Sequence, residues 1–101
     1  YDEAIGLLQD AVRDSHSVME ARHYLGLCFM GKNQYDLALE QFKQALAGHS
    51  KMDEASKELR YHQAQAHEAM GNREEALRFY KQIYSQDIHF RDVAAKVEAL
   101  G

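Results

Sequence analysis

Apolar side chains recur along most of this chain with the spacing of one face of an α-helix. Between residues 35 and 46 they follow the offsets i, i+3, i+4, i+7, i+10 and i+11, one continuous stripe with a helical period. Residues 1–12 keep the same offsets, and residues 76–84 keep most of them, with Arg73 in place of the leading tyrosine. The three stripes are Tyr35, Ala38, Leu39, Phe42, Ala45 and Leu46; Tyr1, Ala4, Ile5, Leu8, Ala11 and Val12; and Ala76, Leu77, Tyr80, Ile83 and Tyr84. No window alternates with a period of two, so the pattern predicts an all-α chain without strands.

Short polar stretches divide the pattern into six predicted helices. The chain has no proline, so glycine, asparagine, serine, aspartate and histidine must form the turns. Residues 31–34 and 71–72 contain glycine and asparagine, which tolerate the left-handed conformation that ends many helices. Looser breaks fall at 15–17, 48–50 and 85–87. The predicted helices cover residues 1–14, 19–31, 35–47, 53–70, 73–85 and 90–100.

The helical pattern is repeated along the chain. Ala4 returns as Ala38, a shift of 38 − 4 = 34 along the chain, and Ala38 returns as Ala76, a shift of 76 − 38 = 38. A helical repeat of this length indicates a solenoid, in which each unit buries its apolar face against its neighbours. The four extra residues of the second interval amount to about one helical turn. We expect them to extend the front of the fourth helix, with Ser50 or Asp53 as its N-cap.

The composition is typical of one soluble globular domain. Of the 101 residues, 46% are hydrophobic and 28% are charged, which excludes a disordered or collagen-like chain. No apolar run approaches the ~20 residues that a membrane-spanning helix needs. The chain begins at Tyr1, inside a repeat and without methionine, so we interpret it as a fragment of a longer protein. The absence of a targeting signal therefore does not define a compartment.

The net charge and the cysteine count exclude two further classes. The formal charge is −4 with dispersed acidic residues, so no basic stripe is present to follow a phosphate backbone, and we expect no nucleic-acid partner. Cys28 is the single cysteine, so no disulfide can form within the domain. We expect it to behave as a small buried hydrophobe, compatible with a reducing compartment such as the cytoplasm.

Six histidines are the basis of an enzyme hypothesis. A metal site on a helix needs ligands at i and i+3 or i+4, but His62 and His67 are five residues apart, about 140° around the helix. His16, His49 and His89 fall near the breaks between repeats, where a polar turn residue is the simpler explanation. No glycine-rich phosphate loop, nucleophile elbow or cysteine pair is present. The sequence thus predicts a non-catalytic chain without metal or cofactor, and a His-based metalloenzyme remains a remote alternative.

Two short blocks with fixed spacing point to a known family. They are Leu25-Gly26-x2-Phe29 for the first block, and Ala38-x3-Phe42 and Ala76-x3-Tyr80 for the second. With them the chain resembles the tetratricopeptide repeat family, whose signature is W-x2-L-G-x2-Y followed by A-x3-F within a 34-residue helix–turn–helix.

The resemblance implies a right-handed superhelical solenoid of antiparallel helix pairs. It places the second helix of a truncated repeat at 1–18, one repeat at 19–52, a second with about one extra helical turn at 53–90, and a capping helix at 91–101. Small residues should lie where paired helices cross closely, and these are Gly26, Ala38, Ala64 and Ala76.

The chain also departs from the family pattern. Arg22 and Arg60 stand where the family favours a large aromatic residue. Gln63 and His67 replace apolar or aromatic residues in the second complete repeat. We therefore expect the first helix of that repeat to have the softest packing in the domain.

In this family the first helices of successive repeats line a concave groove that binds other proteins. The resemblance carries this partner-binding groove to Glu20, His23, Leu27, Met30, Glu58, Tyr61, Gln65 and Glu68. An apolar centre of Leu27, Met30 and Tyr61 beside carboxylates would suit a peptide with apolar and basic residues. The wall lacks the lysines, arginines and asparagines with which some members clamp acidic chaperone tails, so we expect no such clamp. The alternative that these are ordinary solvated helix residues stays open.

A second binding hypothesis rests on the first helix. No preceding helix covers its apolar stripe at Ile5, Leu8 and Val12. Such a stripe predicts self-association, either with another copy or with further repeats of a longer chain.

Overall fold

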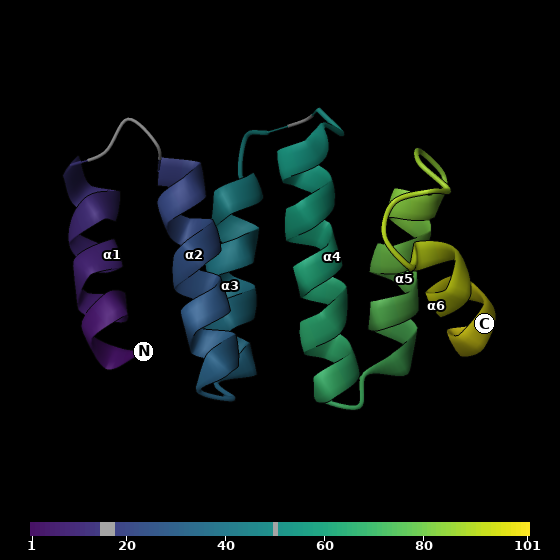
Figure 1. Ribbon diagram of the computed structural model, residues 1–101, viewed down its shortest axis with the longest axis horizontal. Helices are drawn as coiled ribbons and strands as arrows, with labels where there is room; N and C mark the ends of the chain where they lie inside the picture. The colour runs from purple at the N-terminus through teal and green to yellow at the C-terminus, as the bar shows by residue number, and fades with distance from the viewer. Residues whose placement is uncertain (15–17, 50) are drawn as a thin grey trace. The chain divides into compact units, whose positions relative to one another are not determined.

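The structure, a computed structural model, describes residues 1–14, 18–49 and 51–101, and the side chains of residues 12–14 lie outside this description. Over these residues the chain forms six helices and no strand, so the all-α prediction is confirmed (Figure 1). The helices are α1 (Asp2–Asp14), α2 (Val18–Gly31), α3 (Tyr35–Leu46), α4 (Glu54–Ala69), α5 (Arg73–Tyr84) and α6 (Val93–Leu100). The chain divides into two compact units, Tyr1–Ser50 and Lys51–Gly101, hereafter the N-terminal and the C-terminal unit.

The last helix is shorter than the apolar pattern predicts. It begins at Val93 rather than at residue 90. Arg91 has a φ of 44°, in the left-handed region that a continuing helix excludes. Phe90 belongs to a turn in which its N–H donates to the carbonyl of Asp87 at 3.2 Å. The aromatic ring at position 90 is therefore held by the approach to α6 and not by the helix itself.

The fourth helix is the longest, with 16 residues, but it does not gain a full turn. Helix α2 begins at Val18, and the repeat shift of 38 places the equivalent position at 18 + 38 = 56. Helix α4 begins at Glu54, two residues before that position. Asp53 is the N-cap, as expected, because its carboxylate accepts a hydrogen bond from the Ser56 N–H at 2.9 Å. Ser50, the other N-cap candidate, lies outside the described residues.

In the N-terminal unit α2 packs against both α1 and α3. Ala38 and Phe42 of α3 are fully buried. Gly26 of α2 lies directly over the Phe42 ring, since a β-carbon at position 26 would overlap that ring. The predicted close crossing at this glycine is confirmed, and the absent side chain makes room for the aromatic one.

Both helical hairpins turn in the same way. After α2, the Gln34 N–H donates to the Phe29 carbonyl at 2.9 Å, and after α4 the Asn72 N–H donates to the His67 carbonyl at 2.8 Å. Each is the long bond of a Schellman motif, which needs a left-handed residue one place earlier. Asn33, with φ 62°, and Gly71, with φ 80°, hold these places.

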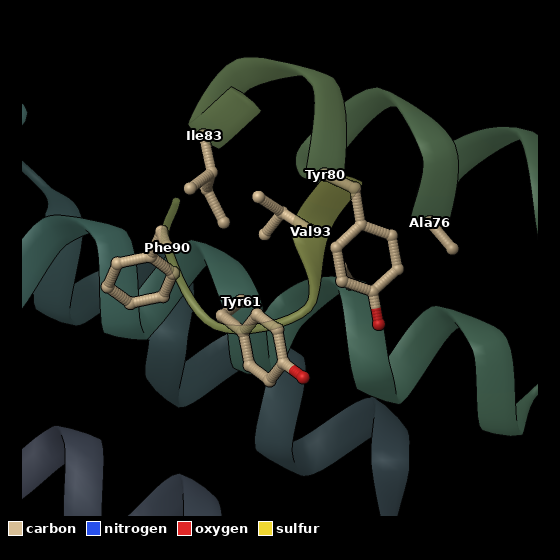
Figure 2. Close-up of a cluster of buried hydrophobic side chains, with 7 residues drawn as sticks. Tyr61, Ala76, Tyr80, Ile83, Phe90 and Val93 are labelled. Carbon is tan, nitrogen blue, oxygen red and sulfur yellow. The ribbon is translucent and has the colours of Figure 1, made fainter. Parts of the chain in front are cut away.

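The core of the C-terminal unit is an aromatic and aliphatic cluster. Figure 2 shows its side chains converging from α4, α5, the turn that holds Phe90 and the start of α6, with the hydroxyl oxygens of Tyr61 and Tyr80 pointing to the same side. The two tyrosine rings meet edge to face with centroids 5.7 Å apart, an arrangement worth about 0.5–1.5 kcal/mol beyond area burial. The buried members are Tyr61, Ala64, Ala76, Tyr80, Ile83, Phe90 and Val93.

Polar contacts replace the large aromatic residue that the family favours at positions 22 and 60. Arg22 donates to the Gln44 side chain, and Arg60 donates to Oε1 of Gln82 at 2.8 Å. The two partners are the same distance along the chain, 44 − 22 = 22 and 82 − 60 = 22 residues. Each hairpin thus joins its two helices by an equivalent arginine–glutamine pair.

Two of the residues that suggested soft packing in α4, Arg60 and His67, make contacts with α5. The His67 ring stacks on Phe79 of α5, with centroids 5.6 Å apart. Gln63 is the exception, because its buried Oε1 accepts no hydrogen bond from any described residue. An unsatisfied buried carbonyl costs about 1–3 kcal/mol. The expectation that this helix has the softest packing stays a prediction.

Candidate functional site

An apolar groove lies between α1 and α2 in the N-terminal unit. It has a volume of about 610 Å³. Leu7 on α1 is 66% exposed and Tyr24 on α2 is 49% exposed, although both are large and apolar. We call this feature the α1/α2 groove. Its lining residues are Tyr1, Ala4, Leu7, Leu8, Tyr24, Leu27 and Cys28.

The groove exists because the apolar stripe of α1 is only partly covered. Ala4 and Leu8 are half-buried, whereas Ala38 and Phe42, their equivalents in α3, are fully buried beneath α2. Helix α1 has no such covering helix among the described residues and contacts only α2. Part of its stripe therefore faces solvent.

Charged residues lie on the same helices as this apolar lining, or directly after them. Lys32 forms an ion pair with Asp2 that ties the end of α2 to the start of α1. The hydrogen bond from Lys32, with its charge, lowers the pKa of the exposed Asp2 carboxyl. Glu3 precedes Leu7 by four residues and Glu20 precedes Tyr24 by four, so each carboxylate shares a helix face with an exposed apolar side chain.

The predicted groove residues of the N-terminal unit do not all have the same environment. Leu27 lines the α1/α2 groove, and Glu20 is exposed. Met30 is half-buried. His23 is also half-buried, with its ring edge-on to Phe42 at a centroid distance of 6.0 Å.

The three residues of the predicted self-association face do not lie together in one site. Leu8 lines the same groove as Leu27, so the structure brings a residue from each binding hypothesis into one site. Ile5 is half-buried and lies outside the groove lining. The side chain of Val12 lies outside the described residues.

In the C-terminal unit the predicted acidic groove residues bind basic residues of the same unit. Glu58 accepts two hydrogen bonds from Nη2 of Arg91, at 2.8 and 2.7 Å. Glu68 accepts a hydrogen bond from the Tyr80 hydroxyl and forms an ion pair with Lys96, whose Nζ lies at 3.1 Å. Both carboxylates therefore help to hold α6 and its approach to α4 and α5.

The remaining predicted residues of α4 also make internal contacts. Tyr61 is only 7% exposed and donates its hydroxyl hydrogen bond to Asp92. Its ring is thus part of the core, in contrast to the expected apolar surface for a partner. Oε1 of Gln65 lies 2.9 Å from Nδ1 of His62.

The family of the chain follows from comparison with known proteins. The sequence profile of the tetratricopeptide repeat matches residues 1–52 and, overlapping them, residues 29–89. The chain belongs to the tetratricopeptide repeat family. Tetratricopeptide repeats generally mediate protein–protein interactions and are typically non-catalytic. A comparison with curated proteins gives no match.

Burial shifts the pKa of several groups in the tetratricopeptide hairpin α4–α5. Burial and the hydrogen bond to Asp92 raise the pKa of Tyr61 to about 12. Burial and the hydrogen bond to Glu68 also raise the pKa of Tyr80. Burial lowers the pKa of His62, although Gln65 and Glu58 act in the opposite direction, and it lowers the pKa of His67 as well. Burial thus favours the neutral form of each of these groups, as befits a packed interior.

Five residues of the α1/α2 groove were not predicted as site residues. Tyr1 and Ala4 were predicted only as part of the apolar stripe of a tetratricopeptide helix, and Cys28 only as part of a helix core. Leu7 and Tyr24 lie outside the regular apolar pattern. Their position beside the core stripe was the signal in the sequence, because a large apolar residue there extends the apolar surface of the helix toward solvent.

In the described part of this tetratricopeptide chain, no three His, Cys, Asp or Glu side chains gather as a metal site would require. No described helix is both long enough and apolar enough to cross a bilayer.

Proposed function

We propose that this tetratricopeptide chain is a non-catalytic scaffold that binds a peptide or a single helix of a partner protein. The observation that carries the proposal is the α1/α2 groove, an apolar surface open to solvent that includes Leu27. Fully burying one leucine side chain contributes about 1.5–3 kcal/mol. A partner that covered Leu7 and Tyr24 would therefore gain substantial free energy from the groove.

The proposed binding residues lie on the first helix of each complete repeat, one set in each unit. On α2 they are Glu20, His23, Leu27 and Met30, and on α4 they are Glu58, Tyr61, Gln65 and Glu68. Glu58 and Glu68 already pair with Arg91 and Lys96 of the same unit, so a basic residue of a partner would have to compete with these cations. A partner segment with lysine or arginine beside apolar residues would complement the two carboxylates. We assign Tyr61 a supporting role, because its ring is buried.

Selection from a peptide library tests the scaffold proposal. Random peptides displayed on phage are selected on the full chain, and their binding to Leu27→Ala is measured by biolayer interferometry. We expect the substitution to weaken binding by about fivefold or more, as loss of an interface anchor does. Leu37→Ala is the matched control, because Leu37 is 48% exposed on α3 and does not line the groove. Selected peptides that bind Leu27→Ala as tightly as the parent chain would reject the groove proposal.

Self-association through α1 is a second candidate, favoured by the exposure of Leu7 next to Leu8 in the same groove. Its proposed face is Ile5, Leu8 and Val12. Sedimentation equilibrium over a range of concentrations distinguishes the two proposals. A mass that remains monomeric at high concentration excludes self-association, whereas a dimer that dissociates on Leu8→Glu substitution supports it.

A further inference from the structure

One arginine side chain of the C-terminal unit lies in a cradle formed by α4 and the turn before α6. The guanidinium group of Arg91 donates to the Glu58 carboxylate from Nε, at 3.1 Å, and from Nη2, at 2.8 and 2.7 Å. Two guanidinium nitrogens and both carboxylate oxygens take part, so the contact matches the planar fork of an arginine and not only its charge. The same group lies over the rings of Tyr61 and Phe90, 5.3 and 5.8 Å from their centroids. We call Glu58, Tyr61 and Phe90 the arginine cradle.

The aromatic walls of the cradle are buried, whereas its occupant is exposed. The Tyr61 and Phe90 rings are each 7% exposed and meet edge to face, with centroids 6.0 Å apart (Figure 2). The Tyr61 hydroxyl also binds Asp92. By contrast, the Arg91 side chain is 51% exposed, and the Glu58 side chain beneath it is 27% exposed. A guanidinium group from outside the chain can therefore approach the same carboxylate.

The backbone of Arg91 opposes this position. Its φ of 44° is in the left-handed region, where the β-carbon of an L-residue lies too close to the following carbonyl oxygen. Asn33 also has a positive φ, but asparagine is of a type that tolerates this region, whereas arginine is not. Strained residues of this kind cluster at ligand clamps and switches, where the surrounding structure holds them in place.

The net hold of the cradle on Arg91 is therefore weak. An exposed ion pair contributes little net free energy, and the strain of a left-handed arginine is of the same order and of opposite sign. The neighbouring pair of Glu68 and Lys96 lacks this opposition, because Lys96 lies inside α6 with a helical backbone. Of these two cations, Arg91 is thus the one that α4 releases more readily.

From these contacts we infer that the arginine cradle binds an arginine of a partner peptide, and that Arg91 is its internal competitor. The inference rests on the proposed scaffold function and specifies how the α4 part of the binding surface is regulated. Displacement replaces one guanidinium group by another, so the contacts with Glu58 and Tyr61 are kept while Arg91 leaves its strained conformation. Lysine has a single ammonium charge and no fork, so it displaces Arg91 less well.

A single capped arginine tests this inference on the full chain. The probe is N-acetyl-arginine amide, and N-acetyl-citrulline amide, which has a similar shape without the charge, is its matched control. Binding is followed by nuclear magnetic resonance from the amide signal of Glu58 in the parent chain and in Arg91→Gly. Glycine adopts a positive φ without strain, so this variant keeps the turn and empties the cradle. We expect saturable binding to Arg91→Gly, and binding about tenfold weaker to the parent chain, where only chains with Arg91 undocked are competent.

Further variants locate the probe. Glu58→Gln, added to Arg91→Gly, should abolish binding, because the carboxylate is lost. Arg91→Gln also removes the guanidinium group but keeps a long side chain, and it should bind the probe more tightly than the parent chain does. Arg78→Gln is the matched control, because Arg78 pairs with the exposed Glu75 on α5 and its loss should leave binding at the parent level. Helical circular dichroism shows whether each variant is folded.

Displacement is read in the parent chain from the Nε–H signal of Arg91, which should move to the position of a free arginine as the probe saturates. Four results would overturn the inference. They are equal binding of the probe by Arg91→Gly and the parent chain, unchanged binding after Glu58→Gln, equal binding of the citrulline compound, or saturation of the parent chain without movement of the Arg91 signal. Phage-selected peptides lost on Leu27→Ala, without any binding of the probe, would reject the cradle and leave the scaffold function in place. Selected peptides indifferent to Leu27→Ala, with the probe bound, would reject the groove and leave the cradle.

Discussion

Asn33 and Gly71 occupy the same place in two turns, related by the repeat spacing of 71 − 33 = 38, and both have a left-handed backbone. The sequence indicated both turns correctly, because asparagine and glycine are the residues that tolerate this conformation. It did not indicate which residue of the stretch 31–34 would adopt it. Gly31 remains in α2 instead, beneath the ring of Tyr1.

The same substitution should have opposite effects at two glycines. Gly71→Ala puts a side chain on a residue with φ 80° and should lower the free energy of unfolding by about 1 kcal/mol. Gly6→Ala lies inside α1 with open space around its β-position, and should raise it by roughly 0.5–1 kcal/mol. Urea unfolding followed by circular dichroism measures both changes. Equal signs for the two variants would contradict the assigned turn geometry.

Residue patterns predicted the core better than the site. Ala38 and Ala76 are fully buried as expected, because helical spacing alone decides which side of a helix faces its neighbour. Tyr61 was expected on an exposed wall but lies in the core. Its burial depends on Phe90 and Asp92, which follow it by 90 − 61 = 29 and 92 − 61 = 31 residues, and no local pattern contains these contacts.

At the scale of the helices, ion pairs hold α4 to the segment that follows α5. Lys57 binds Asp87 at 3.0 Å, and Glu58 binds Arg91. These pairs hold α4 to the segment between α5 and α6. Their charges were visible in the sequence, but their pairing was not. The left-handed Arg91, which shortens α6, was equally invisible, since arginine has no local preference for that conformation.

His62 should make α4 sensitive to acid. Because burial lowers the pKa of His62 in the folded chain, the unfolded chain binds that proton more readily. The free energy of unfolding should therefore fall as the pH drops below ~6.5, the ordinary pKa of histidine. In His62→Gln this part of the acid sensitivity should be absent.

Urea midpoints at pH 7.5 and pH 5.5 test this expectation for the parent chain and for His62→Gln. The difference between the two midpoints should be smaller in the variant, since every other titratable group is shared. An undiminished difference in His62→Gln would show that the ring gains as much from Glu58 when protonated as it loses through burial.

At the scale of the whole molecule, the chain consists of two compact units, each with three helices. The sequence predicted helix pairs and their order correctly, because the repeat spacing sets where each pair begins. It placed the four extra residues of the second interval in one helix, whereas α4 takes only two of them. Asp53 decides that boundary by capping the helix at Glu54.

The C-terminal unit should fold when it is produced alone as residues 51–101. Its cluster of Tyr61, Tyr80, Phe90 and Val93 draws all its members from this segment. A domain of this size rarely exceeds about 3–5 kcal/mol of stability. We expect cooperative urea unfolding and a near-ultraviolet circular dichroism signal from the packed tyrosines.

A destabilised version of the same segment provides the control. Val93 is fully buried, so Val93→Asp should abolish both the cooperative transition and the aromatic signal. If residues 51–101 show neither property without this substitution, the unit is not an independent folding unit.

Cys28 lines the α1/α2 groove and is the chain's single sulfhydryl. Maleimide dyes, the usual reagents for attaching a reporter, would therefore be directed into the very surface under study and would fill it. A labelled preparation of this protein should carry its fluorophore on an introduced cysteine elsewhere, with position 28 changed to alanine or serine beforehand.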